Sequence, residues 1–187
     1  MTAFLAPASV RRLNWGCGAA GEPGWINSDL KEGPGIQITA DIREGLPLDD
    51  DILDYAVSIH ALPMISYPDL VPVLGELRRM LKPQAVLRLG LPDLERAIQA
   101  YQRHDHDYFL VSDEGADSFG GRFITHLLWY GYTVTLFTAD FIEELLWKAG
   151  YQEVRHCAYR QTYSQHAPGI LELDNREAES LFVEAVK

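Results

Sequence analysis

The sequence predicts a doubly wound α/β domain in which seven strands form one mostly parallel sheet. Three observations predict it: strand-like runs alternate with helix-like runs, a glycine-rich turn ends the first strand, and the last two strands have no helix between them. A chain of 187 residues can bury one proper core. We therefore expect a single domain over residues 1–187, with helices on both faces of the sheet and an antiparallel hairpin at one edge.

Short apolar or alternating runs predict the strands. The run over residues 53–59 is mostly apolar, which is typical of a strand buried within a parallel sheet. The others are bounded by glycine, proline or charged residues. The expected strands are Arg12–Trp15, Trp25–Leu30, Ile36–Thr39, Leu53–Ile59, Ala85–Leu91, Glu153–Tyr159 and Leu181–Val186.

Helical periodicity fills three of the gaps between these strands. Residues 69–81 carry leucine and valine at helical spacing and stop before Pro83. A second helix begins near Leu94, and a third begins after Thr138, the expected N-cap, and stops at Gly150. The apolar stripe of the second helix comprises Leu94, Ala97, Ile98 and Tyr101. Residues 105–137 show weak periodicity and are rich in Asp, Gly and aromatic residues, so we expect an irregular insertion there.

Composition limits the classes of partner. The formal net charge of -11 repels phosphate backbones, so no nucleic acid is expected, and a small neutral or cationic partner fits better unless a local basic patch exists. No apolar run is long enough to cross a membrane. Residues 1–10 lack the basic start of a signal peptide, and Cys17 and Cys157 form no CxxC pair. These features predict a cytoplasmic protein.

The turn after the first strand, Gly16–Gly21, matches the GxGxxG pattern of dinucleotide sites. In such sites a helix opens at the third glycine and its N-terminus faces a pyrophosphate. Here the turn sequence Glu22-Pro23-Gly24 follows instead, and Asp29 comes sooner than the typical separation of about 20 residues. An NAD-dependent oxidoreductase is therefore the weaker alternative.

The same turn suits S-adenosylmethionine (SAM) better, because SAM has no phosphate and needs no helix dipole. Glycines let the backbone pass close to its methionine portion, where a Cβ would collide. Asp29, at the end of the second strand, could accept hydrogen bonds from the ribose hydroxyls. Asp41 follows the third strand and is placed to meet the adenine amine.

Five motifs, in this order along the chain, resemble those of class I SAM-dependent methyltransferases. The second of them resembles the GWxNxD stretch of a compact bacterial subgroup whose first helix is very short or absent. The resemblance implies a Rossmann-like methyltransferase fold, SAM as cofactor and methyl transfer as the activity. The motifs are Leu13–Gly18 (LNWGCG), Gly24–Asp29 (GWINSD), Ala40–Leu48 with Asp54–Ser58, Glu76–Pro83 (ELRRMLKP) and Ser180–Lys187 (SLFVEAVK).

Two stretches depart from the family pattern. Subgroup members often carry HxLEH after the fourth strand, whereas His60–Met64 reads HALPM and lacks the Glu-His pair. The usual Gly-Gly after Lys-Pro is replaced by Gln84-Ala85, which alters only a turn. Because of the first departure, a SAM-binding protein that has lost catalysis remains an alternative function.

The expected cofactor residues lie at the ends of the first four strands. Cys17 occupies the variable position of its motif, so we expect it to serve only as backbone scaffold. No metal is expected, because the histidines and aspartates over residues 104–107 alternate at i,i+2 spacing in an acidic loop. The cofactor set is Asn14, Trp15, Gly16, Cys17, Gly18, Asp29, Leu30, Asp41, Ile42, Ser58 and His60.

Three residues are candidates for catalysis: His60 after the fourth strand, and His126 and Tyr130 within the insertion. An imidazole near neutral pKa could remove an acceptor proton as the methyl group transfers. No Asn-Pro-Pro-Tyr loop follows the fourth strand, which disfavours amide or base nitrogen and favours O-methylation of a small sugar- or metabolite-like acceptor. The insertion, residues 105–137, is expected to cover the acceptor side.

Overall fold

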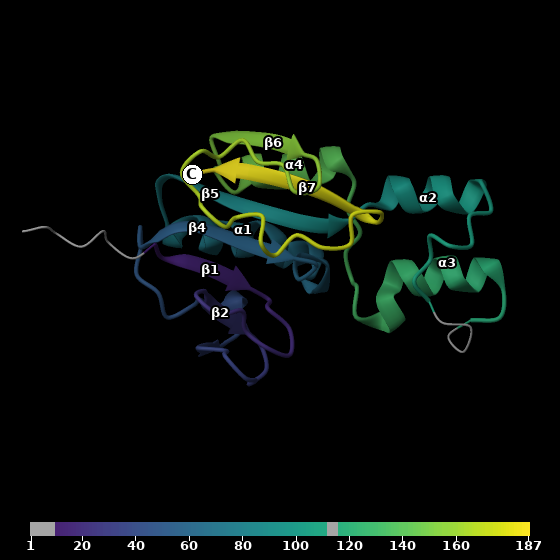
Figure 1. Ribbon diagram of the computed structural model, residues 1–187, viewed down its shortest axis with the longest axis horizontal. Helices are drawn as coiled ribbons and strands as arrows, with labels where there is room; N and C mark the ends of the chain where they lie inside the picture. The colour runs from purple at the N-terminus through teal and green to yellow at the C-terminus, as the bar shows by residue number, and fades with distance from the viewer. Residues whose placement is uncertain (1–9, 112–115) are drawn as a thin grey trace, which may run out of the picture.

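The computed structural model describes residues 10–111 and 116–187 (Figure 1). Residues 1–9 and 112–115, which belong to the expected N-terminus and insertion, lie outside this part. Seven strands form one sheet in the order β3-β2-β1-β4-β5-β7-β6. They are β1 Arg12–Trp15, β2 Ile26–Asp29, β3 Ile38–Thr39, β4 Leu53–Ile59, β5 Leu81–Pro92, β6 Glu153–Cys157 and β7 Ser180–Val186.

The sheet confirms the predicted mostly parallel seven-stranded arrangement with antiparallel strands at its C-terminal edge. The pairs from β3 through β5 are parallel, while β7 runs antiparallel between β5 and β6. The strand order reverses between β1 and β4, where Leu13 pairs with Ala56 and Asn14 pairs with Val57. In such sheets ligands bind at the carboxyl ends of the strands beside this reversal.

The α-helices of the described residues are α1 Leu70–Met80, α2 Leu94–Gln102, α3 Phe119–Leu128 and α4 Ala139–Lys148. Short 3-10 turns lie at Ile42–Glu44 (η1), Leu62–Met64 (η2), Tyr67–Asp69 (η3) and Trp129–Gly131 (η4). The helix after Thr138 begins as predicted, and Gly150 follows its end. None of the described helices is long and apolar enough to cross a membrane.

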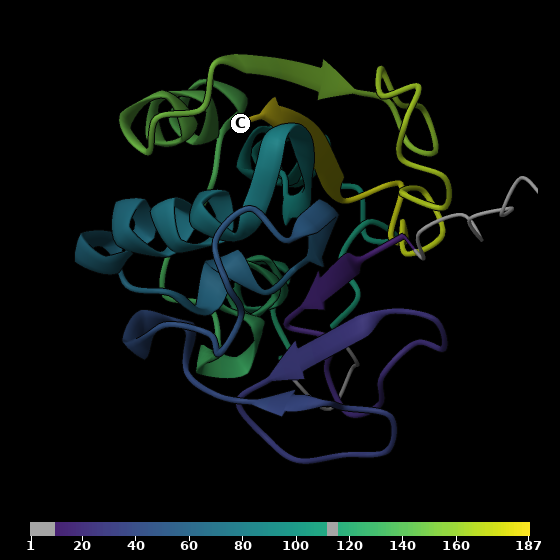
Figure 2. The same cartoon turned by 90° about the vertical axis from the view of Figure 1, so that its left-hand side faces the viewer.

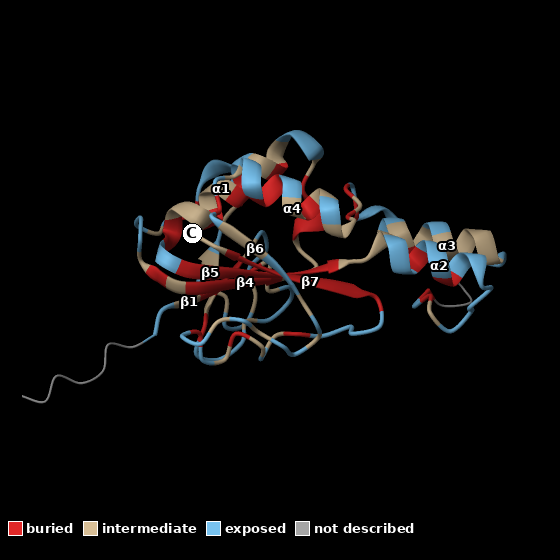
Figure 3. Cartoon of the chain, turned by 90° about the horizontal axis from the view of Figure 1, so that it is seen from above, coloured by how far each residue is buried: buried red, intermediate tan, exposed pale blue. Residues whose placement is uncertain are grey.

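The two faces of the sheet are covered differently. Helices α1 and α4 pack on one face, where the buried leucines of α1 join the main core (Figures 2 and 3). On the other face, residues 158–179 cross as turns and bury Ala167 and Ile170 against Tyr55 and Val57. The expectation of helices on both faces is therefore wrong for the described chain. Pro168-Gly169 and the scarcity of periodic apolar residues prevent a helix here.

The insertion is more regular than predicted. Residues 119–128 form α3, capped by Ser118, whose Oγ accepts a hydrogen bond from the Gly121 N–H at 3.0 Å. Adjacent glycines and β-branched residues weaken helix propensity in this sequence, so the helix depends on packing. Stacking supplies it, because the Phe123 ring lies 4.5 Å from that of Tyr101 on α2.

The face that α2 buries also differs from the predicted stripe. Ala97 and Ala100 are buried, whereas Ile98 and Tyr101 are each 39% exposed. Tyr101 packs on α3 and not on the sheet. Helices α2 and α3 together form a lobe that extends beyond the carboxyl ends of β4 and β5 (Figures 1 and 3).

Candidate functional site

The glycine turn lies at the carboxyl end of β1. The backbone N–H groups of Gly16 and Cys17 donate to the carbonyl of Ser28, at 2.8 and 3.2 Å. Gly16 and Gly18 hold left-handed backbones, with φ of +70° and +79°. A Cβ at Gly16 would lie 2.1 Å from the Cβ of Ala61, whereas one at Gly18 would meet no described atom within 4 Å. Packing thus requires glycine at position 16, and position 18 opens onto space that a ligand could fill.

No helix follows the glycine turn. The described residues between β1 and β2 form turns only, and the Gly21 N–H donates to the carbonyl of Pro34 at 2.7 Å. A dinucleotide site would need a helix N-terminus at this point to face the pyrophosphate. The geometry therefore lacks the feature that the dinucleotide alternative requires.

Asp29 closes the turn from the end of β2. Its Oδ2 accepts a hydrogen bond from the Gly18 N–H at 2.8 Å, and its Oδ1 accepts one from the Lys31 N–H at 3.3 Å. These contacts fix a half-buried carboxylate beside the open face of Gly18. Leu30, next in the chain, leaves its apolar side chain 62% exposed at the same place. A carboxylate next to an uncovered apolar surface fits a ribose and its attached base.

Asp41 is less available than Asp29. It caps η1 by accepting a hydrogen bond from the Arg43 N–H at 3.0 Å, and it also pairs with the Arg43 guanidinium. The side-chain hydrogen bond from Arg43 is the main reason that the pKa of Asp41 is lowered. An adenine amine would have to share this carboxylate with Arg43. Ile42, which follows, is buried in the main core.

The remaining cofactor candidates lie within the sheet. The Asn14 Nδ2 donates to the Oδ1 of Asn27 at 3.0 Å, and Trp15 is 6% exposed in the core. The Oγ of Ser58 is buried near the carboxyl end of β4 without a hydrogen-bond partner among the described residues. Burial and, next, the charge of Asp29 raise the pKa of the Cys17 thiol, which keeps it protonated. That is consistent with the scaffold role expected for Cys17.

His60 follows β4 in a left-handed backbone, with φ of +59°. Its Nε2 lies 2.7 Å from the Oγ of Ser180, the first residue of β7. Burial, followed by the charges of Arg176 and His126, lowers the pKa of His60 to about 3. The ring is therefore neutral at pH 7, where it can accept a proton only weakly.

His126 on α3 reaches the same region from the insertion. Its Nε2 lies 3.3 Å from Oε2 of Glu179, and its Nδ1 is buried without a hydrogen-bond partner among the described residues. Burial and the charge of Arg176 lower the pKa of His126 to about 4. Burial raises the pKa of Glu179, although Arg176 pairs with that carboxylate at 3.1 Å.

A cavity of about 90 Å³ lies where these side chains meet. It brings together His60 and His126, two of the three residues predicted for catalysis. Tyr130 is 52% exposed and lies outside the lining. Ala61, which approaches Gly16, directly follows His60 of the lining, so one residue of the chain separates the cavity lining from the contact with the glycine turn. The lining residues are His60, Pro63, Met64, Pro92, His126, Trp129, Thr133, Arg176 and Glu179.

Sequence reasoning missed Arg176 and Glu179. They lie in the turns before β7, and no motif includes them. The antiparallel pairing of β7 with β5 places Ser180 opposite Pro92, at the carboxyl end of β5. Only this long-range pairing carries both residues to the edge of the sheet where the glycine turn lies.

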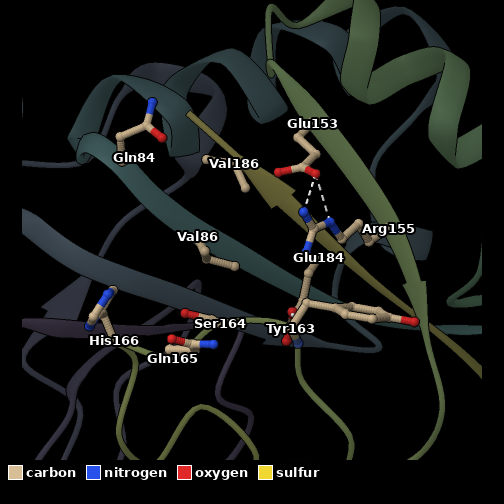
Figure 4. Close-up of a pocket in the computed structure, with 10 residues that line it drawn as sticks. All are labelled: Gln84, Val86, Glu153, Arg155, Tyr163, Ser164, Gln165, His166, Glu184 and Val186. Carbon is tan, nitrogen blue, oxygen red and sulfur yellow. Dashed lines mark hydrogen bonds and ion pairs between the residues drawn. The ribbon is translucent and has the colours of Figure 1, made fainter.

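A larger cavity of about 310 Å³ lies at the other end of the strands (Figure 4). It opens between the start of β5 and residues 163–166, and Arg155 crosses it toward Glu153. The glycine turn is at the opposite edge of the sheet, so this cavity is not part of the candidate site.

No group of three metal-ligating side chains occurs in the part of the chain that the structure describes. The histidines of the acidic loop pack instead against Phe119, whose ring lies 5.5 Å from that of His104 and 4.4 Å from that of His106. Aromatic packing accounts for both rings.

SAM-dependent methyltransferases are among the solved structures with a similar fold. The chain is similar to one from Thermotoga maritima, with 18% identity, 95% of this chain and 82% of that chain covered, and a TM-score of 0.58. It is also similar to one from Archaeoglobus fulgidus, with 11% identity, 96% of this chain and 87% of that chain covered, and a TM-score of 0.60. A third, from Mesorhizobium loti, has 18% identity, with 96% of this chain and 91% of that chain covered, and a TM-score of 0.53. No family model matches the sequence, and no curated relative matches it.

Proposed function

We propose that the protein is a SAM-dependent methyltransferase that acts on a small acceptor. One observation carries the proposal: the Asp29 carboxylate is hydrogen-bonded to the Gly18 N–H at 2.8 Å, beside a face of Gly18 with no described atom nearby. This arrangement offers a fixed acceptor for ribose hydroxyls and room for close approach to the backbone. The shared fold of the structural neighbours supports the same cofactor class.

The residues of this chain would act mainly by placement. SAM supplies a methyl group that its sulfonium already activates, so positioning and exclusion of water account for most of the catalysis. The turn from Gly16 to Gly18 and Asp29 would hold the cofactor, with Leu30 against its base. The cavity beyond Ala61 would receive the acceptor.

O-methylation remains our favoured reaction, with a hydroxyl as acceptor. His60 and His126 are neutral at pH 7 but weakly basic, because their pKa values are lowered to about 3 and about 4. Either imidazole would therefore orient the hydroxyl through a hydrogen bond and assist the removal of its proton only weakly. Tyr130 is 52% exposed and does not line the cavity. The described part of residues 105–137 would cover the acceptor from the lobe side. A SAM-binding protein without catalysis is the second candidate, because HALPM at residues 60–64 supplies no Glu-His pair.

Calorimetry with SAM, S-adenosylhomocysteine and NAD tests the proposal. We expect the first two to bind and NAD not to bind. Asp29→Ala should weaken SAM binding by about 1.5–3 kcal/mol, the scale of hydrogen bonds to a charged group. Asp49→Ala, in the exposed loop before β4, is the matched control and should bind SAM like the parent.

Binding of NAD without SAM would refute the proposal, and so would an Asp29→Ala variant with parental SAM affinity. Turnover of a labelled methyl group onto any acceptor distinguishes the enzyme from the non-catalytic alternative.

A further inference from the structure

The cavity at the carboxyl edge is built from strained backbone. His60, Trp129 and Arg176 all line it, and their φ values are +59°, +43° and +53°. Each such residue costs on the order of 1–3 kcal/mol and persists only where its surroundings fix it, and such residues cluster at ligand sites. The three come from separate segments, after β4, after α3 and before β7. The strain therefore converges on the cavity.

Arg176 is held there in a defined orientation. Its guanidinium carbon lies 4.8 Å from the centre of the Trp129 ring, and its Nη1 lies 3.1 Å from Oε1 of Glu179. Its Nε and Nη2 have no recorded partner within the described residues, and the side chain is 37% exposed. A guanidinium fixed on one face and one edge presents its remaining donors as a planar fork, which matches the geometry of oxyanions.

Among the residues that the structure describes, no other cation lines the cavity. The two histidines are neutral at pH 7, since burial is the main cause that lowers the pKa of His60 to about 3 and that of His126 to about 4. Pro63, Met64 and Pro92 are apolar. The single carboxylate, Glu179, is already paired with Arg176 and lies next to His126. Within the described lining, the donors of Arg176 are thus the positive feature that a ligand would meet.

We propose that this cavity binds an oxyanion at one end of the acceptor, a carboxylate or a phosphate, and that Arg176 determines this specificity. The inference rests on the proposed function in that the bound molecule is taken to be the methyl acceptor. About 90 Å³ is less than the roughly 150 Å³ that holds a benzene ring, so only the anionic end enters. The net charge of -11 makes such a local cation necessary for an anionic acceptor.

Arg155 provides a matched control. It lies 5.2 Å from the Tyr163 ring and pairs with Glu153, but it lines the cavity at the opposite edge (Figure 4). Arg155→Gln removes the same charge from the same kind of aromatic and carboxylate contacts. It should leave anion binding at the Arg176 cavity unchanged.

The test is a nuclear magnetic resonance titration that follows the indole N–H of Trp129, assigned with Trp129→Phe. Acetate and inorganic phosphate are the anionic probes, and acetamide and methylammonium are the neutral and cationic probes, all at matched ionic strength. We expect saturable shifts of the indole signal with acetate or phosphate. The probe with the higher affinity identifies the oxyanion as a carboxylate or a phosphate. Arg176→Gln should weaken that binding about tenfold or more, the scale of one charged hydrogen bond. Arg176→Lys keeps the charge opposite Glu179 and serves if the glutamine variant does not fold.

Equal shifts with acetamide or methylammonium would overturn the inference, and so would parental anion affinity in Arg176→Gln or Arg176→Lys. SAM binding is measured separately by calorimetry. A protein that binds SAM but neither anion refutes this inference and leaves the proposed function standing. A protein that binds the anion at Trp129 but not SAM refutes the proposed function and leaves the anion site.

Discussion

The two ends of the sheet carry cavities with similar side-chain contacts. At the carboxyl edge Arg176 lies 4.8 Å from the Trp129 ring, and at the opposite edge Arg155 lies 5.2 Å from the Tyr163 ring. Each arginine also pairs with a glutamate. The cavity at the opposite edge is the larger, at about 310 Å³ against about 90 Å³. Contact type and volume therefore do not distinguish the two places.

Backbone strain and burial do distinguish them. Three residues that line the smaller cavity are left-handed, whereas Gln84 is the one such residue among those lining the larger cavity. The carboxylate that pairs with Arg176 is 5% exposed, and Glu153, which pairs with Arg155, is 46% exposed. Left-handed backbone at non-glycine residues costs stability and clusters at ligand sites. A buried charge pair alone does not mark such a site, because Arg88 forms one with Asp174 and Glu184 on the side of the larger cavity. We take the comparison to separate a functional edge from a structural one.

The largest expected effect is a loss of stability on substitution of Arg88, on the sheet face that the coil covers. Arg88 is fully buried under the coil of residues 158–179, where it pairs with Asp174 at 2.6 Å and Glu184 at 2.8 Å. Arg88→Met leaves two buried carboxylates without their partner, so the free energy of unfolding should fall by about 3–5 kcal/mol. Urea denaturation measures it, with Arg155→Met, an exposed pair, expected to lose less than about 1 kcal/mol.

SAM affinity of the folded Arg88→Met fraction should remain parental, because Arg88 is on β5 and its side chain faces the coil. Loss of SAM binding with unchanged stability would show that the two edges are not separate.

The next effect distinguishes the two glycines of the turn. Gly16→Ala places a Cβ 2.1 Å from that of Ala61 on a left-handed backbone, and should cost about 2–3 kcal/mol of stability. Gly18→Ala meets no described atom and should cost only the backbone strain of about 1–2 kcal/mol, while it weakens SAM binding. Denaturation and calorimetry on each variant measure these two quantities.

The double variant Gly16→Ala/Ala61→Gly tests the cause. Removal of the Ala61 methyl should restore the part of the stability that the collision removes and leave the backbone strain. If the double variant were no more stable than Gly16→Ala, the contact with Ala61 would not be the reason for glycine at position 16.

The sequence was sufficient for those parts of the molecule that local pattern determines. Apolar runs located every strand of the sheet, although β3 is reduced to Ile38–Thr39 and β5 begins at Leu81, where α1 ends. The glycine turn and Asp29 belong to consecutive motifs that end neighbouring strands. The sequence therefore predicted their proximity, which the hydrogen bond of 2.8 Å from the Gly18 N–H to Asp29 shows.

Long-range packing determined what the sequence could not show. The helix α3 forms although its glycines disfavour it, because Phe123 stacks on Tyr101. The coil over the second face is held by Arg88 and Asp174, which are far apart in the sequence. Arg176 and Glu179 reach the cavity only because β7 inserts between β5 and β6. None of these pairings leaves a periodic signal.

The smallest expected effect, taken per pH unit and per residue, is the pH dependence of stability that the carboxyl ends of the strands confer. His60 and His126 are buried with pKa values lowered to about 3 and about 4, whereas a histidine in the unfolded chain titrates near 6.5. Below pH 6.5 the unfolded chain takes up protons that the folded chain does not. The free energy of unfolding should therefore fall as the pH drops from 6.5 toward 4, by up to about 1.4 kcal/mol per pH unit for each ring.

Glu179 opposes this trend, because burial raises its folded pKa above the ordinary 4.5. Its contribution to stability is complete below pH 4.5 and is lost as the pH rises through the folded pKa. His60→Asn tests the histidine term, since asparagine tolerates the left-handed backbone at position 60. Urea denaturation between pH 4 and 7 measures the free energy of unfolding at each pH. Its slope against pH should be smaller in His60→Asn than in the parent by up to about 1.4 kcal/mol per pH unit, which corresponds to one proton. His166→Asn, which replaces an exposed histidine that lines the opposite cavity, is the matched control. Equal slopes in the parent and His60→Asn would mean that His60 is not held neutral, and the contrast between the two edges would then rest on backbone strain alone.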